Sequence, residues 1–290
     1  MKASYAHYTL HFRQPAGTSR GVLTEKETYF LKLEDEDMPG VFGLGECAVF
    51  RGLSADDVPT YEDKLRELCA NISADKETDL HEFPSIRFGL ETAINDFANG
   101  CRRQPFPSDF TEGMSAIPIN GLVWMGTKEE MLHRIDDKIK AGFTTIKLKV
   151  GAIDTESELD LVRHIRKVFP PEVLTIRLDA NGGFTPDNAL QKLSDFARYG
   201  IHSIEQPIKQ GQWEAMRRIC SESPIDIALD EELIGIHTPE RMGEMLDAVR
   251  PKYIILKPSL IGGFSGSQDW IMQAARRDIG GWVTSALESS

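Results

Sequence analysis

The sequence predicts an α/β protein, a TIM-type (β/α) barrel preceded by a smaller α+β domain. Two patterns carry this prediction. After residue 115, short β-branched runs alternate with amphipathic stretches about every 25 to 30 residues, as parallel strands with right-handed helical crossovers do. The first hundred residues instead place extended runs before helices, which is the order of an α+β unit. We therefore predict two domains, residues 1–114 and 115–290.

The amino-terminal domain is predicted to hold three strands followed by two helices. Turn-forming residues separate its extended runs, at Gly17–Gly21 and at Asp35–Gly40. Pro105 and Pro107 mark the segment Arg103–Gly113 as a linker. The predicted strands are residues 4–12, 22–33 and 41–48, and the predicted helices are residues 57–71 and 86–101.

Seven β-branched runs predict the strands of the second domain. Several of the helical stretches between them open with a cap: Thr127, Thr155 and Ser265 each begin a capping box, while Thr185 and Thr238 each precede a proline. Because a complete barrel has eight strands, we expect an incomplete barrel, truncated before its last strand. The predicted strands are Ile117–Leu122, Thr144–Val150, Leu174–Asp179, Ser203–Glu205, Ile225–Asp230, Tyr253–Lys257 and Trp282–Ala286.

Composition excludes several classes of protein. The 290 residues include 33 basic and 45 acidic side chains, a formal charge of −12, so no nucleic-acid partner is expected. No uncharged apolar run is long enough to cross a membrane, and the first residues lack the pattern of a secretory signal. The 4 cysteines form no C-x-x-C pair, which favours reduced thiols and a cytoplasmic location.

A charged residue ends each of five successive predicted strands. The spacing between neighbours in this series is one strand-and-helix unit. The carboxyl ends of all barrel strands surround one mouth, where the active site forms. Three carboxylates are therefore predicted to converge there, with lysines to either side. The five residues are Lys149, Asp179, Glu205, Asp230 and Lys257.

The three carboxylates predict a metal ion. Unpaired acidic groups that share a dry pocket repel one another and lose their hydration, and a divalent cation removes both costs. Oxygen ligands suit Mg²⁺, with Mn²⁺ as a substitute, and the lack of His or Cys at these strand ends argues against zinc. We predict Asp179, Glu205 and Asp230 as ligands, with Glu231 and Glu232 as competitors of Asp230.

Lys147 and Lys149 stand two apart on one strand, so their side chains point to the same face. If that face is the barrel interior, like charge and burial lower a lysine pKa, and one of the two can act as a base near pH 7. Lys257 is predicted to lie across the mouth from Lys149. A metal ion with opposed lysines suits removal of a proton from the carbon beside a carboxylate.

Each of these residues also has a simpler interpretation. An Asp at a strand end is commonly a turn or cap residue, and Lys-x-Lys in a strand is commonly a solvated face. Lys257, which precedes a proline, could instead form a Schiff base, as in barrel aldolases, and borohydride trapping would reveal it. These simpler interpretations would have to hold independently for each residue. Five charged residues, each one strand-and-helix unit after the last, therefore favour a shared site.

The predicted barrel part contains the motifs T-I-K-L-K-V-G, R-L-D-A-N-G, I-E-Q-P, A-L-D-E, L-K-P-S-L-I-G-G and S-A-L-E-S-S. In these motifs the chain resembles the enolase superfamily in its muconate-lactonising branch, and within that branch the o-succinylbenzoate synthase family. Towards the amino terminus, the segments Gly43–Ser54 and Ile86–Phe97 resemble the loop and helix of that family's capping domain.

The resemblance implies a modified barrel and an α+β capping domain that closes over its mouth. It implies that Lys149 is the acid and base of the reaction, that Lys257 is the opposing cation, and that Lys147 tunes Lys149. Asn181 would support these groups from just outside the site, and the metal would lie on the same three carboxylates.

The implied reaction is a syn dehydration of 2-succinyl-6-hydroxy-2,4-cyclohexadiene-1-carboxylate in menaquinone biosynthesis. Ser285 and Ser289 are candidates for holding a carboxylate of this small-molecule substrate. An N-acylamino acid racemase or dipeptide epimerase of the same superfamily would use Lys149 and Lys257 as two bases. A metal-stabilised barrel that only binds its ligand would show no deuterium exchange at the substrate. The sequence does not predict an oligomeric state.

Overall fold

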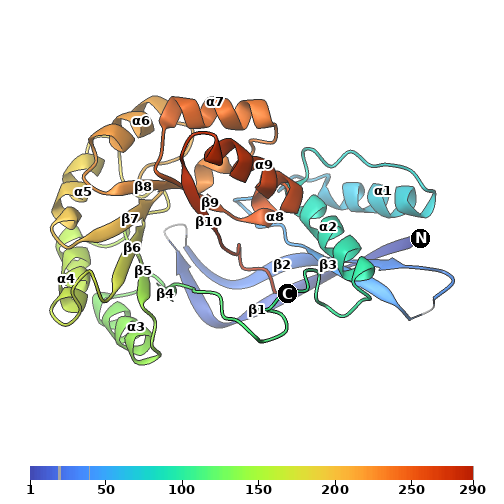
Figure 1. Ribbon diagram of the computed structural model, residues 1–290, viewed down its shortest axis with the longest axis horizontal. Coiled ribbons are helices and arrows are strands. Elements are labelled where there is room, and N and C mark those ends of the chain that lie inside the picture. Colours follow the sequence, from blue (N-terminus) through green and yellow to red (C-terminus); the bar gives the residue numbers. More distant parts are fainter. Residues whose placement is uncertain (19–20, 39, 290) are drawn as a thin grey trace.

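The computed structural model describes residues 1–18, 21–38 and 40–289. These residues form two sheets (Figure 1). A three-stranded antiparallel sheet has the order β1-β2-β3, and a seven-stranded parallel sheet has the order β10-β9-β8-β7-β6-β5-β4. Sequence neighbours are therefore spatial neighbours throughout the parallel sheet, as the repeated strand-and-helix unit predicted. The sheet curves into an open half-barrel, which confirms the predicted fold class.

The amino-terminal part follows its predicted order of three strands and two helices. The hairpin of the first two strands is longer than predicted, because its antiparallel register continues past an irregularity between His11 and Ala16. Three residues of the predicted turns, Ser19, Arg20 and Pro39, lie outside the described residues. The elements are β1 (Lys2–Thr18), β2 (Gly21–Glu34), β3 (Phe42–Cys47), α1 (Tyr61–Ser73) and α2 (Pro84–Ala98).

Helix α2 packs directly on strand β3 because glycines line their contact. A Cβ atom on Gly45 would lie 1.8 Å from the carbonyl oxygen of Gly89, and one on Gly43 would lie 2.1 Å from the carbonyl oxygen of Ala93. No side chain fits at either place. This close contact fixes the end of β3, where Glu46 is 1 % exposed and the chain turns toward the parallel sheet.

The parallel sheet carries helices on its convex side, where Figure 1 shows α3 to α7 following the curve of the strands. Its strands are β4 (Gly121–Val123), β5 (Thr145–Lys149), β6 (Thr175–Asp179), β7 (Ile201–Glu205), β8 (Asp226–Leu229), β9 (Tyr253–Leu256) and β10 (Gly280–Val283). Its helices are α3 (Lys128–Lys140), α4 (Thr155–Arg166), α5 (Ala189–Ala197), α6 (Trp213–Glu222), the 3₁₀ turn η1 (Glu231–Leu233), α7 (Pro239–Val249), α8 (Pro258–Ile261) and α9 (Gly263–Ala275).

The two outer strands differ from their predicted positions. The run Ile117–Leu122 was predicted as a strand, but Ile117 and Ile119 are exposed and only β4 pairs with β5. Ladder pairing of β10 ends at Val283, opposite Leu256. The physical reason is that β9 ends at Leu256 and Pro258 begins α8, so Ser285, which the register would place opposite Pro258, has no strand to pair with.

Helix caps were predicted with mixed success. Thr127 forms the predicted capping box and Thr238 caps α7 ahead of its proline. The prediction for Thr155 was wrong, because the preceding Asp154 accepts the bond from Ser157 and starts α4 one residue earlier than expected. Two further caps were wrong: Thr185 exchanges hydrogen bonds with Asn188 in a turn before α5, and Ser265 lies inside α9.

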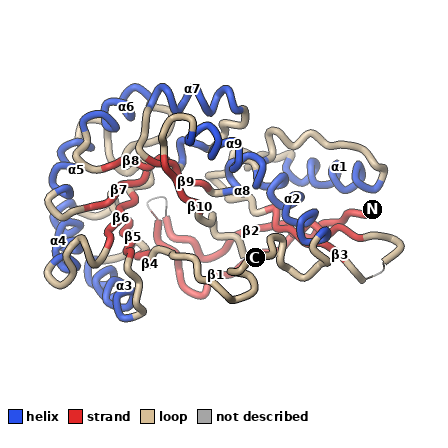
Figure 2. Tube along the Cα trace, in the orientation of Figure 1, coloured by secondary structure: helices blue, strands red, loops and turns tan. Residues whose placement is uncertain are grey.

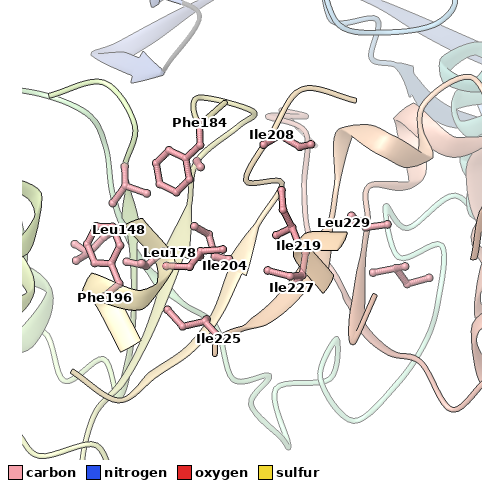
Figure 3. Close-up of a cluster of buried hydrophobic side chains, with 14 of the residues drawn as sticks. Leu148, Leu178, Phe184, Phe196, Ile204, Ile208, Ile219, Ile225, Ile227 and Leu229 are labelled. Atoms are coloured by element: carbon pink, nitrogen blue, oxygen red, sulfur yellow. The ribbon is translucent and has the colours of Figure 1, made fainter. Parts of the chain in front are cut away.

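Apolar side chains of the strands and the surrounding helices form one core (Figure 3). Leu148, Leu178 and Ile204 point from neighbouring strands toward helix residues such as Phe196. Figure 2 shows the same layering by element type, with the strands inside the ring of helices. Residues one position away on the same strands point to the concave side, and these positions carry the charges discussed below.

In the described part of the chain, no helix has the length and apolarity needed to cross a membrane.

Candidate active site

The register of the parallel sheet aligns three of the predicted residues. Lys149 on β5 is opposite Asp179 on β6, and Asp179 is opposite Glu205 on β7. Asp230 follows the end of β8 and Lys257 follows the end of β9. The predicted series of charged residues therefore lies along one edge of the sheet, at the carboxyl ends of five neighbouring strands, as expected for parallel strands.

Both lysines of β5 bind the acidic residues of the next two strands. The Nζ atom of Lys149 lies 2.6 Å from Asp179 Oδ2 and 2.6 Å from the side-chain oxygen of Asn181. The Nζ atom of Lys147 lies 2.5 Å from Glu205 Oε2 and 2.9 Å from Asp179 Oδ2. Both side chains lie almost wholly inside the protein, so the face they share is the barrel interior and not a solvated face.

On the far side of this cluster, Lys257 donates to Asp230, with Nζ 2.5 Å from Oδ2. Asn181 connects the two sides, because its oxygen accepts from Lys149 while its Nδ2 donates to Glu231 at 3.0 Å. The backbone of Asn181 is left-handed, with φ at 44°, a conformation that asparagine tolerates better than most residues.

Buried charge shifts the pKa values of the cluster in opposite directions. Burial raises the pKa of Glu205 to about 7; Lys147 opposes the rise, and the charges of Asp179 and Asp230 add to it. Burial also acts on Asp179, but the ammonium groups of Lys147 and Lys149 outweigh it and hold that pKa well below its usual range. These interactions show that the three carboxylates and the lysines act on one another electrostatically.

Two lysines of the cluster, Lys147 and Lys257, have shifted pKa values and remain cations. Burial favours the neutral form of Lys147, but Asp179 and Glu205 outweigh it and raise the pKa of Lys147 above its ordinary value. Burial acts in the same way on Lys257, and Asp230 again reverses the effect, so the pKa of Lys257 is also raised. Lys147 is therefore a cation and not a neutral base.

A cavity of about 120 Å³ opens above this cluster, between the strand ends and the amino-terminal part. Its polar lining includes the three lysines, Asn181 and Ser285, which are all predicted site residues. Sequence reasoning missed the rest of the lining, although two of these residues belong to the segment Gly43–Ser54 that resembles a capping loop. The missed residues are Phe50, Leu53, Leu122, Trp124, Thr284, Ala286 and Leu287.

The two predicted substrate-binding serines lie in different places. Ser285 lines the cavity. Ser289 instead donates both its amide and its hydroxyl hydrogen to Glu46 Oε2, at 2.7 and 2.9 Å, and does not line the cavity. Its placement does not support substrate binding, because its polar hydrogen is already used by a buried carboxylate of β3.

A buried glutamine that the sequence analysis did not select organises the loop after β8. Gln206, inside the motif I-E-Q-P, accepts hydrogen bonds from the amides of Asp230 and Glu232 at 3.2 Å each. Its amide nitrogen donates to Glu232 Oε2, and Gly211 donates to the other oxygen of that carboxylate. Glu232 therefore holds the loop together, and its side chain is engaged away from the predicted ligands.

The residues present suit a hard divalent cation. Asp179, Glu205 and Asp230 offer carboxylate oxygen alone, and Glu205 Oε1 is buried with no hydrogen-bond partner among the described residues. In the part of the chain that the structure describes, no three His, Cys, Asp or Glu side chains are yet arranged to hold a metal ion. Each predicted ligand is instead paired with a lysine, so the metal assignment stays a prediction.

The pKa of Glu205 predicts how Mg²⁺ binding depends on pH. A carboxyl group with a pKa of about 7 carries a proton below that pH, and the proton competes with the metal. The Mg²⁺ dissociation constant is expected to rise about tenfold for each pH unit below 7 and to level off above it. Calorimetric titrations at several pH values on either side of 7 measure this, and a constant affinity throughout would contradict a ligand carboxylate whose pKa is raised to about 7.

Comparisons with known proteins agree with this architecture. A family model described as enolase C-terminal domain-like matches residues 130–289. An o-succinylbenzoate synthase from Desulfotalea psychrophila is 43 % identical over 324 aligned residues, covering 100 % of this chain and 87 % of the relative. The crystal structure of MenC from the same organism has a TM-score of 0.87 at 40 % identity and covers 100 % of this chain and 87 % of that one.

More distant relatives include both synthases and epimerases. The o-succinylbenzoate synthase of Thermosynechococcus elongatus, solved with magnesium in its active site, has a TM-score of 0.76 at 25 % identity and covers 99 % of this chain and 85 % of that chain. An L-Ala-D/L-Glu epimerase from Bacillus subtilis is 31 % identical over 245 residues, which is 79 % of this chain and 65 % of the relative.

The parallel half-barrel and the amino-terminal antiparallel sheet match the fold of the Desulfotalea protein over the whole chain. The chain belongs to the enolase superfamily. Within the superfamily it is more similar to the Desulfotalea synthase than to the epimerase, both in identity and in the share of each chain that aligns.

Proposed function

We propose that this chain is an o-succinylbenzoate synthase, a lyase that dehydrates 2-succinyl-6-hydroxy-2,4-cyclohexadiene-1-carboxylate to 2-succinylbenzoate in menaquinone biosynthesis. Its 43 % identity to a synthase over the whole chain supports the choice of reaction. The single structural observation that carries the proposal is the cavity that Lys149 and Lys257 line together, above three buried carboxylates. A small carboxylate substrate is the partner that such a cavity suits.

Lys149 is the acid and base in this proposal. Its amine takes the proton from the ring carbon beside the carboxylate, and the electron pair left behind expels the hydroxyl group on the neighbouring carbon. The proton on Lys149 then goes to the departing hydroxide, so that one water molecule leaves and the ring becomes aromatic. Both transfers occur on one face of the ring, so one lysine suffices.

The neighbouring residues hold Lys149 and balance charge. Asn181 and Asp179 each lie 2.6 Å from Nζ and fix its direction. Lys147 is a cation between Asp179 and Glu205, and it shares the Asp179 carboxylate with Lys149. Lys257, a cation on the opposite side, stabilises negative charge that develops on the ring.

Asp179, Glu205 and Asp230 would hold Mg²⁺, with Mn²⁺ as a substitute, in exchange for part of their pairing with lysine. A relative solved with magnesium in its active site supports this choice of ion. When bound, the cation would supply Lewis-acid stabilisation of the substrate carboxylate as the neighbouring proton leaves.

An assay of the purified chain with the cyclohexadiene substrate and Mg²⁺ tests the proposal. The ultraviolet spectrum changes when the ring becomes aromatic, and a chelator is expected to stop that change. A protein that binds Mg²⁺ and the substrate but forms no 2-succinylbenzoate would contradict the proposed function. Exchange of the substrate proton with deuterium separates a failure of proton transfer from a failure of dehydration.

A superfamily racemase or epimerase is the second candidate, because two lysines facing one cavity also suit two-base chemistry. Variants of Lys257 separate the two candidates. Arginine keeps the charge but cannot act as a base near neutral pH.

For the synthase, Lys257→Arg is expected to retain at least about tenfold more turnover than Lys257→Met, because only the charge is needed. The expected kcat of Lys257→Met is lower than that of the wild type by about a hundredfold or more. A racemase would lose racemisation equally in both variants. Initial rates of dehydration and of racemisation of an N-acylamino acid, measured side by side, provide the comparison.

We also propose the predicted division into a capping domain, residues 1–114, and a barrel domain, residues 115–290. The absence of any helix or strand between Asn99 and Asn120 supports a boundary in that region. A cytoplasmic location remains part of the proposal and is supported by the 4 cysteines, which are all free thiols.

A further inference from the structure

The segment that follows β10 crosses from the barrel to the antiparallel sheet. Its residues Thr284–Ser289, called here the pocket segment, line the cavity with Thr284, Ser285, Ala286 and Leu287. In Figure 1 the segment runs from β10 to the end marked C, beside the strands of the antiparallel sheet. It has no strand pairing of its own beyond the bond from Thr284 to Leu256, so other groups must hold it in place.

Two charged side chains of the antiparallel sheet bind the pocket segment. Lys26, on β2, donates from Nζ to the carbonyl oxygen of Leu287 at 3.0 Å. Glu46, on β3, accepts from both the amide and the hydroxyl group of Ser289 through Oε2. The two side chains pair with each other at 3.7 Å and are 5 % and 1 % exposed.

Glu288 binds the pocket segment from the barrel side. Its Oε1 accepts from the hydroxyl group of Ser259 at 2.5 Å, and its Oε2 accepts from the amide of Ala286 at 2.7 Å. Ser259 lies in α8, two residues after Lys257. One carboxylate therefore links the cavity wall to the element that carries the opposing cation.

We propose that Lys26 and Glu46 are positioning residues, which fix the pocket segment from the amino-terminal sheet so that Ser285 and its neighbours form the substrate-facing wall of the cavity. The proposal rests on the proposed function for its kinetic readout. Neither residue lines the cavity, so both act through the backbone of the segment rather than on the substrate.

The physical reason is the strength of charge-assisted hydrogen bonds in a buried place. Exposing a backbone carbonyl group of a segment without strand pairing costs little free energy. A hydrogen bond from a buried ammonium group holds that carbonyl group in place more firmly than a bond from a neutral donor does. Removing one partner of the buried pair leaves the other charge uncompensated, so the segment and the sheet are expected to loosen together.

Lys26→Met tests the proposal, since methionine has a similar length but neither charge nor donor. We expect KM for the cyclohexadiene substrate to rise about tenfold or more while kcat changes by less than about threefold, because substrate binding and not proton transfer depends on the wall. Amide hydrogen exchange of residues 284–289 is expected to become about tenfold faster. Lys26→Arg keeps the charge and a donor and is expected to restore most of the loss.

Thr28→Val is the matched control. Thr28 is fully buried, and the hydrogen bonds of its hydroxyl group go to Glu46 Oε1 at 2.9 Å and to the carbonyl oxygen of Cys47, not to the pocket segment. It is expected to lower stability while KM and the exchange of residues 284–289 stay within about twofold of wild type. The proposal is overturned if Lys26→Met leaves both quantities within that range, or if Thr28→Val changes them as much as Lys26→Met does.

Two features keep the test decisive. If Lys26→Met does not fold, Glu46→Gln keeps the size of the side chain, removes its charge and is measured in the same way. Hydrogen exchange needs no substrate, so it reports on the pocket segment even if the wild-type chain forms no 2-succinylbenzoate. In that case the proposed function fails, while faster exchange in Lys26→Met would still support the positioning role.

Discussion

Replacing Lys149 with alanine is expected to lower kcat by at least about a thousandfold, because one side chain serves as both base and acid. In the proposed mechanism, no neighbouring side chain can take over the role of this lysine. Lys147 is a cation held between two carboxylates, and Lys257 pairs with Asp230 on the other side of the cavity. Proton exchange between substrate and deuterated solvent should be lost together with dehydration.

Magnesium binding should survive the loss of Lys149. Asp179 keeps its contact with Lys147, and the removal of a nearby positive charge does not weaken the attraction for a cation. Calorimetric titration with Mg²⁺ is the measurement, and Lys128→Ala is the control, since Lys128 is a lysine of α3 that pairs with Asp160 outside the cluster. Turnover near the wild-type rate in Lys149→Ala would refute the assignment.

The second large effect is expected for Asp179→Asn. This change removes a predicted metal ligand, and it also weakens the group that contacts both lysines of β5. We expect Mg²⁺ affinity to fall by more than about a hundredfold, since loss of supporting residues outside a metal's ligands already costs about 10- to 100-fold. Turnover should fall with it at any practical Mg²⁺ concentration.

Asp160→Asn provides the comparison, because it also removes the charge of an aspartate that is paired with a lysine, but on the outer side of the barrel. It should leave both Mg²⁺ affinity and turnover near wild type. If Asp179→Asn bound Mg²⁺ as tightly as the wild type, Asp179 would have only a structural role as the partner of Lys147 and Lys149. The remaining carboxylates would then need another explanation for their burial.

The sequence alone determined the repeated strand-and-helix architecture and the row of charges at the strand ends. Both are encoded locally: β-branched runs form strands, and the side chain at a strand end is fixed by its position in the run. Lys149, Asp179 and Glu205 therefore lie side by side in register, as their spacing predicted. Thr127 and Thr238 are caps for the same local reason.

Features that depend on two distant segments were decided only by the tertiary structure. The end of β10 depends on where Pro258 stops β9, and the different places of Ser285 and Ser289 depend on Glu46, more than two hundred residues earlier in the chain. Lys26 of the antiparallel sheet likewise binds the cavity wall at the carbonyl oxygen of Leu287. Local patterns fix which face a side chain is on, but the partner it meets there is set by packing between elements that the sequence does not place next to each other.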